Sequence, residues 1–333
     1  IAITGMTIMN SDNNMYSSGI YAKELDVEVY DCTIMECNMF IRLIGDYRDF
    51  KATINNNNFF QQTSAEEAIY IEKYNSEITI SENTLNGDGG VIAAEYGIYI
   101  ENSSNLNIAQ NVISDYSDYT DAAIHIEESS RIVISDNDMF YCKDAISLFN
   151  NQAVEVIDND IDNGERFVKY YHDIGNESLL IKNNTVNNFL FNCVSGEGAC
   201  VIEDNTFKQC GTGCILICNF NTETNMADVI VDNNFISFYH QRPTIHTAFV
   251  FGKKLNVIIK NNTVMGEDNS TSYFLNVLQQ GTTYPTNISV INNIILDFQD
   301  IYHGVPSEDD DIVINYCCSS CEIPEEFLPE DYD

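Results

Sequence analysis

The chain repeats one pattern of apolar and polar residues along its whole length. Two aliphatic residues, separated by one variable residue, begin the pattern. A second variable residue, two polar residues, a third variable residue and an apolar residue follow, as in 78–85, 106–113 and 132–139. Apolar side chains at every second position predict strands with one buried face. The second polar position marks copies 21 to 31 residues apart, at Met6, Cys32, Asn57, Asn83, Asn111, Asn137, Asn159, Asn184, Asn205, Asn234, Asn262, Asn293 and Cys317.

A second alternating segment lies between successive copies of this pattern, often opened by Gly or Ala, as in 97–100 and 123–126. No segment keeps a 3.6-residue period, so helices are not expected. Leucine-rich repeats need a different consensus, and propeller blades need roughly 40 residues or more. We therefore predict an all-β fold, a single parallel β-helix (a solenoid) of about 12 to 13 coils.

An Asn column is expected at one bend of every coil. This bend needs a residue near left-handed α geometry, which Asn tolerates better than other residues except Gly. Asn amides one coil apart can also hydrogen-bond to each other and satisfy buried polar groups. The expected structural ladder consists of Asn57, Asn83, Asn111, Asn137, Asn159, Asn184, Asn205, Asn234, Asn262 and Asn293, with Met6, Cys32 and Cys317 replacing Asn at the ends of the run.

These I-x-x-N-x-I phrases resemble those of the right-handed parallel β-helix repeat proteins of the pectate-lyase-like superfamily. The resemblance covers nearly the whole chain. It implies a right-handed β-helix. The repeat predicts this β-helix over 1–316, and the residues after it predict a Cys-containing acidic tail or linker over 317–333. The resemblance does not imply one activity, because the superfamily includes polysaccharide lyases, glycoside hydrolases, epimerases, tailspikes, adhesins and non-catalytic surface proteins.

The charge balance excludes several kinds of partner. The chain has 51 acidic and 15 basic side chains among 333 residues, a formal net charge of -36. A field this negative repels nucleic acids and anionic membranes. No apolar run approaches the ~18 residues of a membrane helix, so direct membrane insertion is not expected.

Eleven cysteines favour several disulfides and a few buried thiols over structural zinc, because paired C-x-x-C knuckles are missing. The disulfide candidates are Cys193, Cys200, Cys210, Cys214, Cys218, Cys317, Cys318 and Cys321, with Cys193 and Cys218 as one conceivable pair. Candidate N-glycosylation sites stand at Asn102, Asn176, Asn183, Asn261, Asn269 and Asn287. Both sets are typical of a secreted, extracellular or cell-surface glycoprotein.

Catalytic signatures expected of the resembled enzymes are incomplete. The hydrolase signatures are represented only by fragments at 221–223, 303–304 and 309–310, and the lyase signature only by Arg242-Pro243. A long insertion that carries His240 and His246 is where a groove-lining site would first be sought. Weak calcium candidates are Asp115, Asp118 and Asp121, for which a solvated acidic loop is the favoured reading. No other cofactor is expected.

The leading functional hypothesis is an extracellular structural β-helix that builds a cell-surface filament, appendage or adhesin. Its partners would be copies of itself or other domains, stacked at the coil ends or laterally, because the first eight residues already match the repeat. A polysaccharide lyase or glycoside hydrolase with a groove along the β-helix is the second hypothesis. A non-catalytic glycan-binding adhesin is the third. Whether the chain is an enzyme stays open, and the missing signatures favour a non-catalytic role.

Overall fold

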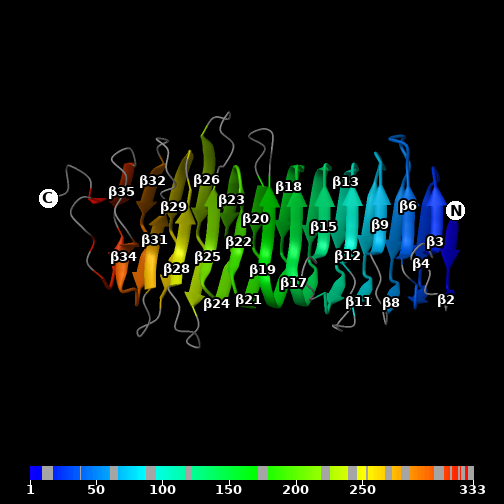
Figure 1. Cartoon of the computed structure of the whole chain (residues 1–333), viewed down its shortest axis with the longest axis horizontal. Coiled ribbons are helices and arrows are strands. Elements are labelled where there is room, and N and C mark those ends of the chain that lie inside the picture. The colour runs from blue at the N-terminus through cyan, green and yellow to red at the C-terminus, as the bar shows by residue number, and fades with distance from the viewer. Residues whose placement is uncertain are drawn as a thin grey trace. The chain divides into compact units, whose positions relative to one another are not determined.

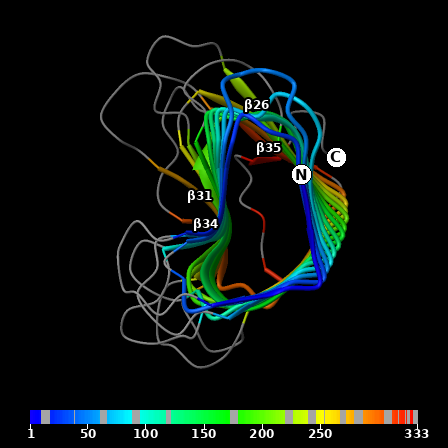
Figure 2. The same cartoon turned by 90° about the vertical axis from the view of Figure 1, so that its right-hand side faces the viewer.

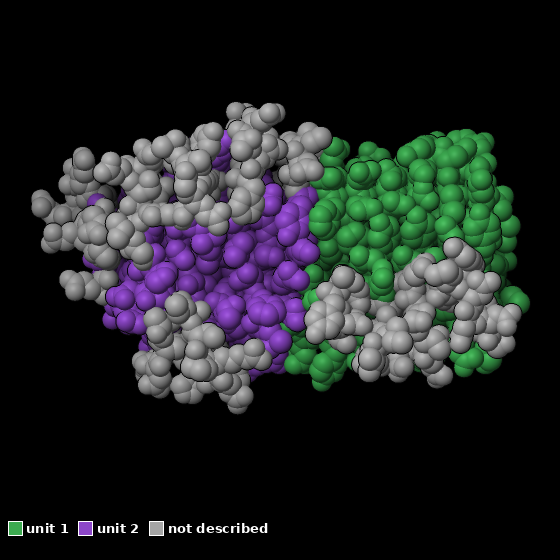
Figure 3. Space-filling model, in the orientation of Figure 1, with its two compact units in different colours: residues 1–164 green, residues 165–333 purple. Residues whose placement is uncertain are grey.

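A computed structural model shows a chain built of strands and their connections. It describes residues 1–9, 18–37, 39–60, 67–87, 95–116, 122–171, 179–218, 226–238, 246–252, 254–266, 272–278, 286–303, 311–315, 317–321, 323 and 327–328. These residues contain 36 β-strands and no α-helix. Nothing in the described part of the chain forms a helix that could span a membrane. The chain divides into two compact units, residues 1–164 and 165–333 (Figure 3).

In unit 1, each coil contributes strands to three parallel stacks (Figure 1). The first stack contains β1 (Ala2–Thr4), β4 (Val27–Tyr30), β7 (Ala52–Asn55), β10 (Ile78–Ser81), β13 (Ser104–Ala109), β16 (Ser130–Ser135) and β18 (Gln152–Ile157). The second contains β2 (Thr7–Met9), β5 (Thr33–Met35), β8 (Asn58–Phe60), β11 (Thr84–Asn86), β14 (Val112–Ser114) and the start of β17 (Asp138–Phe149). The third contains β3 (Ser18–Lys23), β6 (Met39–Ile44), β9 (Glu67–Glu72), β12 (Tyr96–Glu101), β15 (Ala122–Glu127) and the end of β17.

The strands of unit 2 also form three parallel stacks. The first contains β20 (Leu179–Lys182), β23 (Cys200–Glu203), β26 (Ala227–Asp232), β29 (Leu255–Lys260), β32 (Asn287–Ile291) and β35 (Asp311–Asn315). The second contains β21 (Thr185–Phe189), β24 (Thr206–Cys210), β27 (Phe235–Phe238), β30 (Thr263–Met265), β33 (Ile294–Leu296) and β36 (Cys318–Ser319). The third contains the end of β19 (Asp160–Tyr171), which begins in unit 1, then β22 (Asn192–Glu197), β25 (Gly213–Cys218), β28 (His246–Phe251), β31 (Ser272–Val277) and β34 (Asp300–His303).

The core of unit 1 is a set of aliphatic columns inside the coils. Pairing in register places Ile54 beside Ile80, Ile80 beside Ile108, and Ile108 beside Ile134. All four side chains are fully buried. Burying an Ile side chain contributes roughly 1.5 to 3 kcal/mol, and β-branched side chains pack well on a pleated sheet. The same alternation that predicted the strands therefore provides the interior of the coil, and the coils of each unit lie over one another in Figure 2.

A ladder of buried Asn side chains follows the first stack in unit 1. Asn83 Nδ2 donates to Asn111 Oδ1 at 3.0 Å, and Asn111 Nδ2 donates to Asn137 Oδ1 at 2.9 Å. The same oxygens accept from the backbone N–H of the preceding ladder residue. At one end the backbone N–H of Cys32 donates to Asn57 Oδ1 at 2.9 Å. Cys32 thus ends the ladder through its backbone N–H, and this hydrogen bond does not need an Asn side chain at position 32.

Unit 2 contains its own ladder of the same kind, formed by Asn184, Asn205, Asn234, Asn262 and Asn293. Each member is at most 2% exposed. The last described step runs from the backbone N–H of Asn293 to Cys317 Sγ at 3.5 Å. The expected parallel β-helix with an Asn ladder is therefore confirmed.

The explanation of the bend needs one correction. The left-handed residue is the one before each ladder Asn, as at Glu82 with φ 57°, Asp136 with φ 54° and Asn261 with φ 56°. The ladder Asn itself does not carry the positive φ. Asn is needed at the second polar position because its amide both donates and accepts inside the coil. The first polar position accepts several residue types because its side chain points outward, where it can be solvated.

Candidate functional site

A groove of about 340 Å³ opens on the outer face of the third stack of unit 2. It lies over β19, β22 and β25 and the bend before β22. Its lining residues are Glu165, Arg166, Tyr171, Phe191, Asn192, Ser195, Gly196, Glu197 and Leu216. This volume falls within the range of small-molecule sites in proteins.

Strand alternation determines which side chains reach the groove. In β22, Val194 is buried, whereas its neighbours Ser195 and Glu197 are half-buried and point outward. The register places Ser195 beside Leu216 on β25 and Glu197 beside Tyr171 on β19. Residues from three separate coils therefore meet on one face, although up to 51 positions separate them in the sequence.

Two glycines make room for side chains near the groove. A Cβ on Gly196 would lie 2.3 Å from the ring of Tyr170, which is fully buried. A Cβ on Gly213 would lie 2.3 Å from Oδ1 of Asn192. Each close approach requires the absence of a side chain. Gly196 thereby lets the Tyr170 ring fill the interior beneath the groove.

The groove combines aromatic rings with hydrogen-bonding groups of both kinds. The Phe191 side chain is 44% exposed, and Tyr171 is half-buried with the Lys169 ammonium 5.6 Å from its ring centroid. Glu165 and Glu197 supply carboxylates, while Arg166 supplies guanidinium donors. Asn192 and Ser195 add an amide and a hydroxyl. An open site with apolar surfaces and several polar groups suits a ligand that carries both CH faces and hydroxyl groups.

On the corresponding face of unit 1, the aromatic rings stack on one another. The rings of Tyr70 and Tyr99 stack at 5.5 Å between centroids, and those of Tyr99 and His125 stack at 4.9 Å. The Arg42 guanidinium carbon lies 5.5 Å from the Tyr70 ring centroid. Because these rings cover each other's faces, cross-strand stacking accounts for them as structural residues.

The hydroxyl groups of this stack are also engaged. Tyr70 donates to Glu101 and Tyr99 donates to Glu127, both at 2.5 Å. Burial, followed by the hydrogen bond to each carboxylate, raises the pKa of both tyrosines well above the ordinary value. Both phenols stay protonated at physiological pH, as a donor to a carboxylate must.

The structure describes only part of the site expected from the sequence. His246 begins β28 and is buried, with Nδ1 at 2.6 Å from the carbonyl oxygen of Gly211. It therefore belongs to the coil and not to a groove-lining insertion. Asp115 accepts a hydrogen bond from the Asn86 amide at 3.3 Å. His240, Arg242 and Pro243, the calcium candidates Asp118 and Asp121, and the fragments at 221–223 and 309–310 lie outside the described residues.

The sequons occupy two kinds of position. Asn183, Asn261 and Asn287 are exposed, and Asn102 is half-buried. Asn261 donates to Asp232 at 2.8 Å and accepts from Asn292 at 2.8 Å. Asn176 and Asn269 lie outside the described residues. Glycosylation at these sites stays a prediction.

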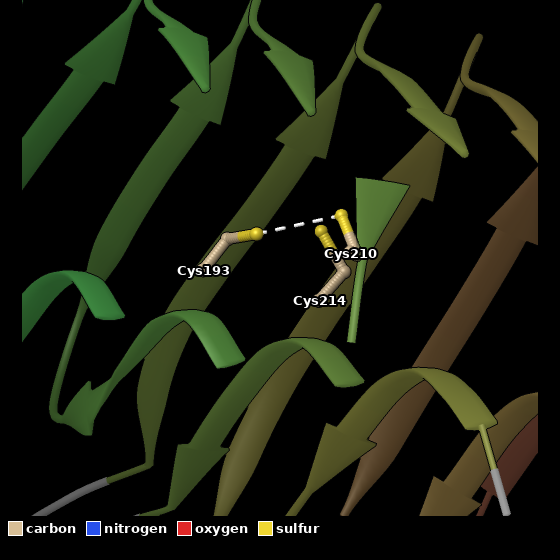
Figure 4. Close-up of side chains that lie close together, drawn as sticks. All are labelled: Cys193, Cys210 and Cys214. Atoms are coloured by element: carbon tan, nitrogen blue, oxygen red, sulfur yellow. Dashed lines mark hydrogen bonds between the residues drawn. The ribbon is translucent and has the colours of Figure 1, made fainter. Parts of the chain in front are cut away.

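Three of the disulfide candidates form a buried thiol cluster, Cys193 on β22, Cys210 on β24 and Cys214 on β25 (Figure 4). Their sulfur atoms all lie within 4.8 Å of one another, and those of Cys193 and Cys210 are 3.4 Å apart. Burial raises the pKa of Cys193 and Cys214 well above the ordinary thiol value. Burial opposes ionisation of Cys210 as well, but hydrogen bonds from the other two thiols outweigh it and lower the pKa of Cys210.

The suggested pairing of Cys193 with Cys218 is wrong, because the register places Cys218 beside Glu197. Among the other candidates, Cys200 is buried on β23, while Cys317, Cys318 and Cys321 lie at or after the last described coil. The cluster could have been found in the sequence. Cys193 and Cys214 are 21 residues apart, the same spacing as ladder residues Asn184 and Asn205.

The chain is similar to known proteins in sequence pattern and in fold. A family model described as a right-handed β-helix region matches residues 18–173 and 68–236, which together span more than half of the chain. The curated proteins contain no match to the sequence.

Two solved structures illustrate the similarity of fold. The A-module of the mannuronan C-5 epimerase AlgE6 from Azotobacter vinelandii is 10% identical, with a TM-score of 0.56, over 90% of this chain and 91% of that chain. The catalytic unit of a GH87 α-1,3-glucanase from Streptomyces thermodiastaticus is 11% identical, with a TM-score of 0.54, over 96% of this chain and 64% of that chain. At these identities the similarity concerns the fold alone.

Proposed function

The chain belongs to the right-handed β-helix family, and from this premise we propose that it is an extracellular protein that binds a glycan in the groove of unit 2 without cleaving it. The observation that carries the proposal is the groove itself. It places the exposed ring of Phe191 near carboxylate, guanidinium, amide and hydroxyl groups in one hollow. Sugar rings present CH faces that pack on aromatic rings and hydroxyl groups that both donate and accept hydrogen bonds.

The similar structures support a glycan as the ligand class. Both proteins are named for action on polysaccharides, an epimerase and a glucanase on the same fold. Glu165 and Glu197 keep glycosidic cleavage open as a second function, since hydrolysis of glycosides uses a pair of carboxylates. The incomplete catalytic signatures favour binding over turnover.

A glycan-binding groove also fits the predicted adhesin or surface appendage. The sequons and cysteine content that predicted secretion support an extracellular location. Stacking of copies or other domains on the coils, as a filament would need, stays a prediction of the repeat. Electron microscopy and size-exclusion chromatography of the native protein test it, and a strictly monomeric native protein would contradict it.

The binding proposal is tested with a panel of uronate and neutral polysaccharides, with and without calcium. We expect saturable binding by titration calorimetry and no release of reducing ends or unsaturated products. Phe191→Ala and Tyr171→Ala should each weaken binding roughly 5- to 10-fold, because each removes an apolar surface worth about 1 kcal/mol.

Tyr141→Ala is the matched control, since Tyr141 is 57% exposed and is not one of the residues that line the groove. Its binding should equal that of the wild type. Unchanged affinity in the Phe191→Ala protein would refute the proposed site. Product formation that is lost in Glu165→Gln or Glu197→Gln would replace binding with the enzymatic alternative.

A further inference from the structure

The thiol cluster of unit 2 brings together cysteines from two successive coils. Cys193, Cys210 and Cys214 are each 0% exposed. The sulfur atoms of Cys193 and Cys210 approach to 3.4 Å. Three thiols allow three pairings, and spacing along the chain does not choose among them.

The register argues against a bond between Cys193 and Cys214. Asn192 pairs with Gly213 and Val194 pairs with Ile215, so Cys193 and Cys214 occupy equivalent positions on neighbouring parallel strands. Side chains at such positions point the same way, about 4.8 Å apart, whereas the Cβ atoms of a disulfide lie about 3.5 to 4.5 Å apart. A bond between them would need the two strands to shift.

Cys210 approaches from a different direction. It ends β24 in the second stack, where the register places it beside Phe189. Its side chain therefore meets Cys193 from another strand stack and not from the next strand of the same stack (Figure 4). A disulfide between them requires the sulfur atoms to move from 3.4 Å to about 2.05 Å apart.

We propose that Cys193 and Cys210 form a disulfide that joins two successive coils of unit 2, with Cys214 retained as a thiol beside it. The two cysteines each give up their sulfur-bound hydrogen as a proton, and a bond forms between the sulfur atoms. The two electrons pass to the disulfide of a thiol–disulfide oxidoreductase, which takes up the two protons and leaves as a dithiol.

The order of events follows from burial. Reaction with an oxidant needs a thiolate and access to it, and both are restricted once the coils have packed over the cluster. The bond therefore forms while this part of the chain is folding. In the folded protein it is shielded from external reductants, as a structural disulfide is.

The pairing is tested on the full chain secreted from a eukaryotic host, alkylated in denaturant without reduction. Tandem mass spectrometry should find Cys193 linked to Cys210 and Cys214 alkylated. Cys193→Ala and Cys210→Ala should lose the link and lower Tm by roughly 5 °C, because the bond closes a loop of about 17 residues. Wild-type protein unfolded in the presence of a strong reductant should show the same fall.

Cys214→Ala and Cys200→Ala are the matched controls, because each removes a buried thiol without removing the bond. Both should keep the Cys193–Cys210 link and a Tm closer to that of the wild type. Three outcomes would overturn the proposal: three alkylated cysteines, a link through Cys214, or stoichiometric zinc or copper found by elemental analysis and bound by all three thiols.

Discussion

Each ladder Asn makes hydrogen bonds in both directions along its unit. Asn137 Nδ2 donates to the carbonyl oxygen of Ile108 at 2.9 Å and to Asn159 Oδ1 at 3.0 Å. Its Oδ1 accepts from the backbone N–H and the side chain of Asn111. A buried residue that satisfies this many groups is difficult to replace, because each orphaned donor or acceptor costs about 1 to 3 kcal/mol.

Replacing Asn137 by Ala should lower the free energy of unfolding by roughly 3 kcal/mol or more. The change removes the acceptor of the Asn111 backbone N–H, one of the three acceptors of the Asn111 side-chain amide, and the donor to the carbonyl of Ile108. Urea denaturation followed by circular dichroism measures the loss. The matched control is Asn107→Ala on β13, where the side chain is exposed and the expected change is within about 0.5 kcal/mol. Equal losses in both variants would show that the ladder does not stabilise the coil.

At the residue scale, the sequence predicts what is periodic. The ladder members could be named because their marker recurs in each coil. The positive φ was assigned one residue too late, because both polar positions often hold Asn and the sequence does not show which one turns inward. The three cysteines of the thiol cluster were among the disulfide candidates, but the suggested pair of Cys193 with Cys218 aligned the two coils at the wrong positions, because Cys214 is the residue one repeat after Cys193.

At the scale of the strand, β22 serves the core and the groove at once. Its inward residues are Cys193, Val194 and Gly196, and its outward residues are Ser195 and Glu197. Two consecutive inward residues at its start shift the alternation, as the burial pattern shows. The glycine lets a large ring from the neighbouring strand occupy the core beneath the groove.

Gly196→Ala should lower the free energy of unfolding by roughly 2 kcal/mol, since its methyl group would overlap the ring of Tyr170. Thermal and urea unfolding measure this change. Ser195→Ala is the control on the same strand, because its side chain faces outward and should alter stability little. If Gly196→Ala unfolds like the wild type, the Tyr170 ring can move away and does not define the floor of the groove.

The strands themselves were largely predictable, but the groove was not. Alternation locates β10, β13 and β16 because each one repeats the same inward columns. The groove depends on which outward side chains meet across coils, and outward positions carry no periodic constraint. Aligning 165–171, 192–197 and 213–218 by repeat would have brought its aromatic and charged residues together.

At the scale of the whole molecule, repulsion among acidic side chains destabilises the folded state. The net charge is -36 on 333 residues, and 15 basic side chains cannot neutralise 51 acidic ones. Among the described ion pairs, Lys182 with Glu203 is 2.6 Å long and partly exposed, so water and salt screen the attraction between the two charges. Screening by salt should therefore matter more than individual pairs.

We expect Tm to rise by roughly 3 to 6 °C between about 0.02 and 0.5 M sodium chloride, because screening shortens the range of the repulsion. Differential scanning calorimetry measures the shift. Potassium chloride is the control and should act equally. A comparable rise in about 0.1 mM calcium, where screening is negligible, would instead indicate specific cation binding, for example at Asp115 and its neighbours.

The nearest-neighbour character of the ladder has a consequence for how such a chain can change over generations. The side-chain amide of each interior ladder Asn donates to the ladder Asn of the next coil, and its side-chain oxygen accepts from the ladder Asn of the coil before it. If the gene segment for one coil were duplicated or deleted, the coils that then became neighbours would form the same Asn–Asn hydrogen bonds. Spacings from 21 to 31 residues show that the connecting segments already absorb differences in length. Evolution can therefore add or remove whole coils, and the remaining coils keep the same interior contacts.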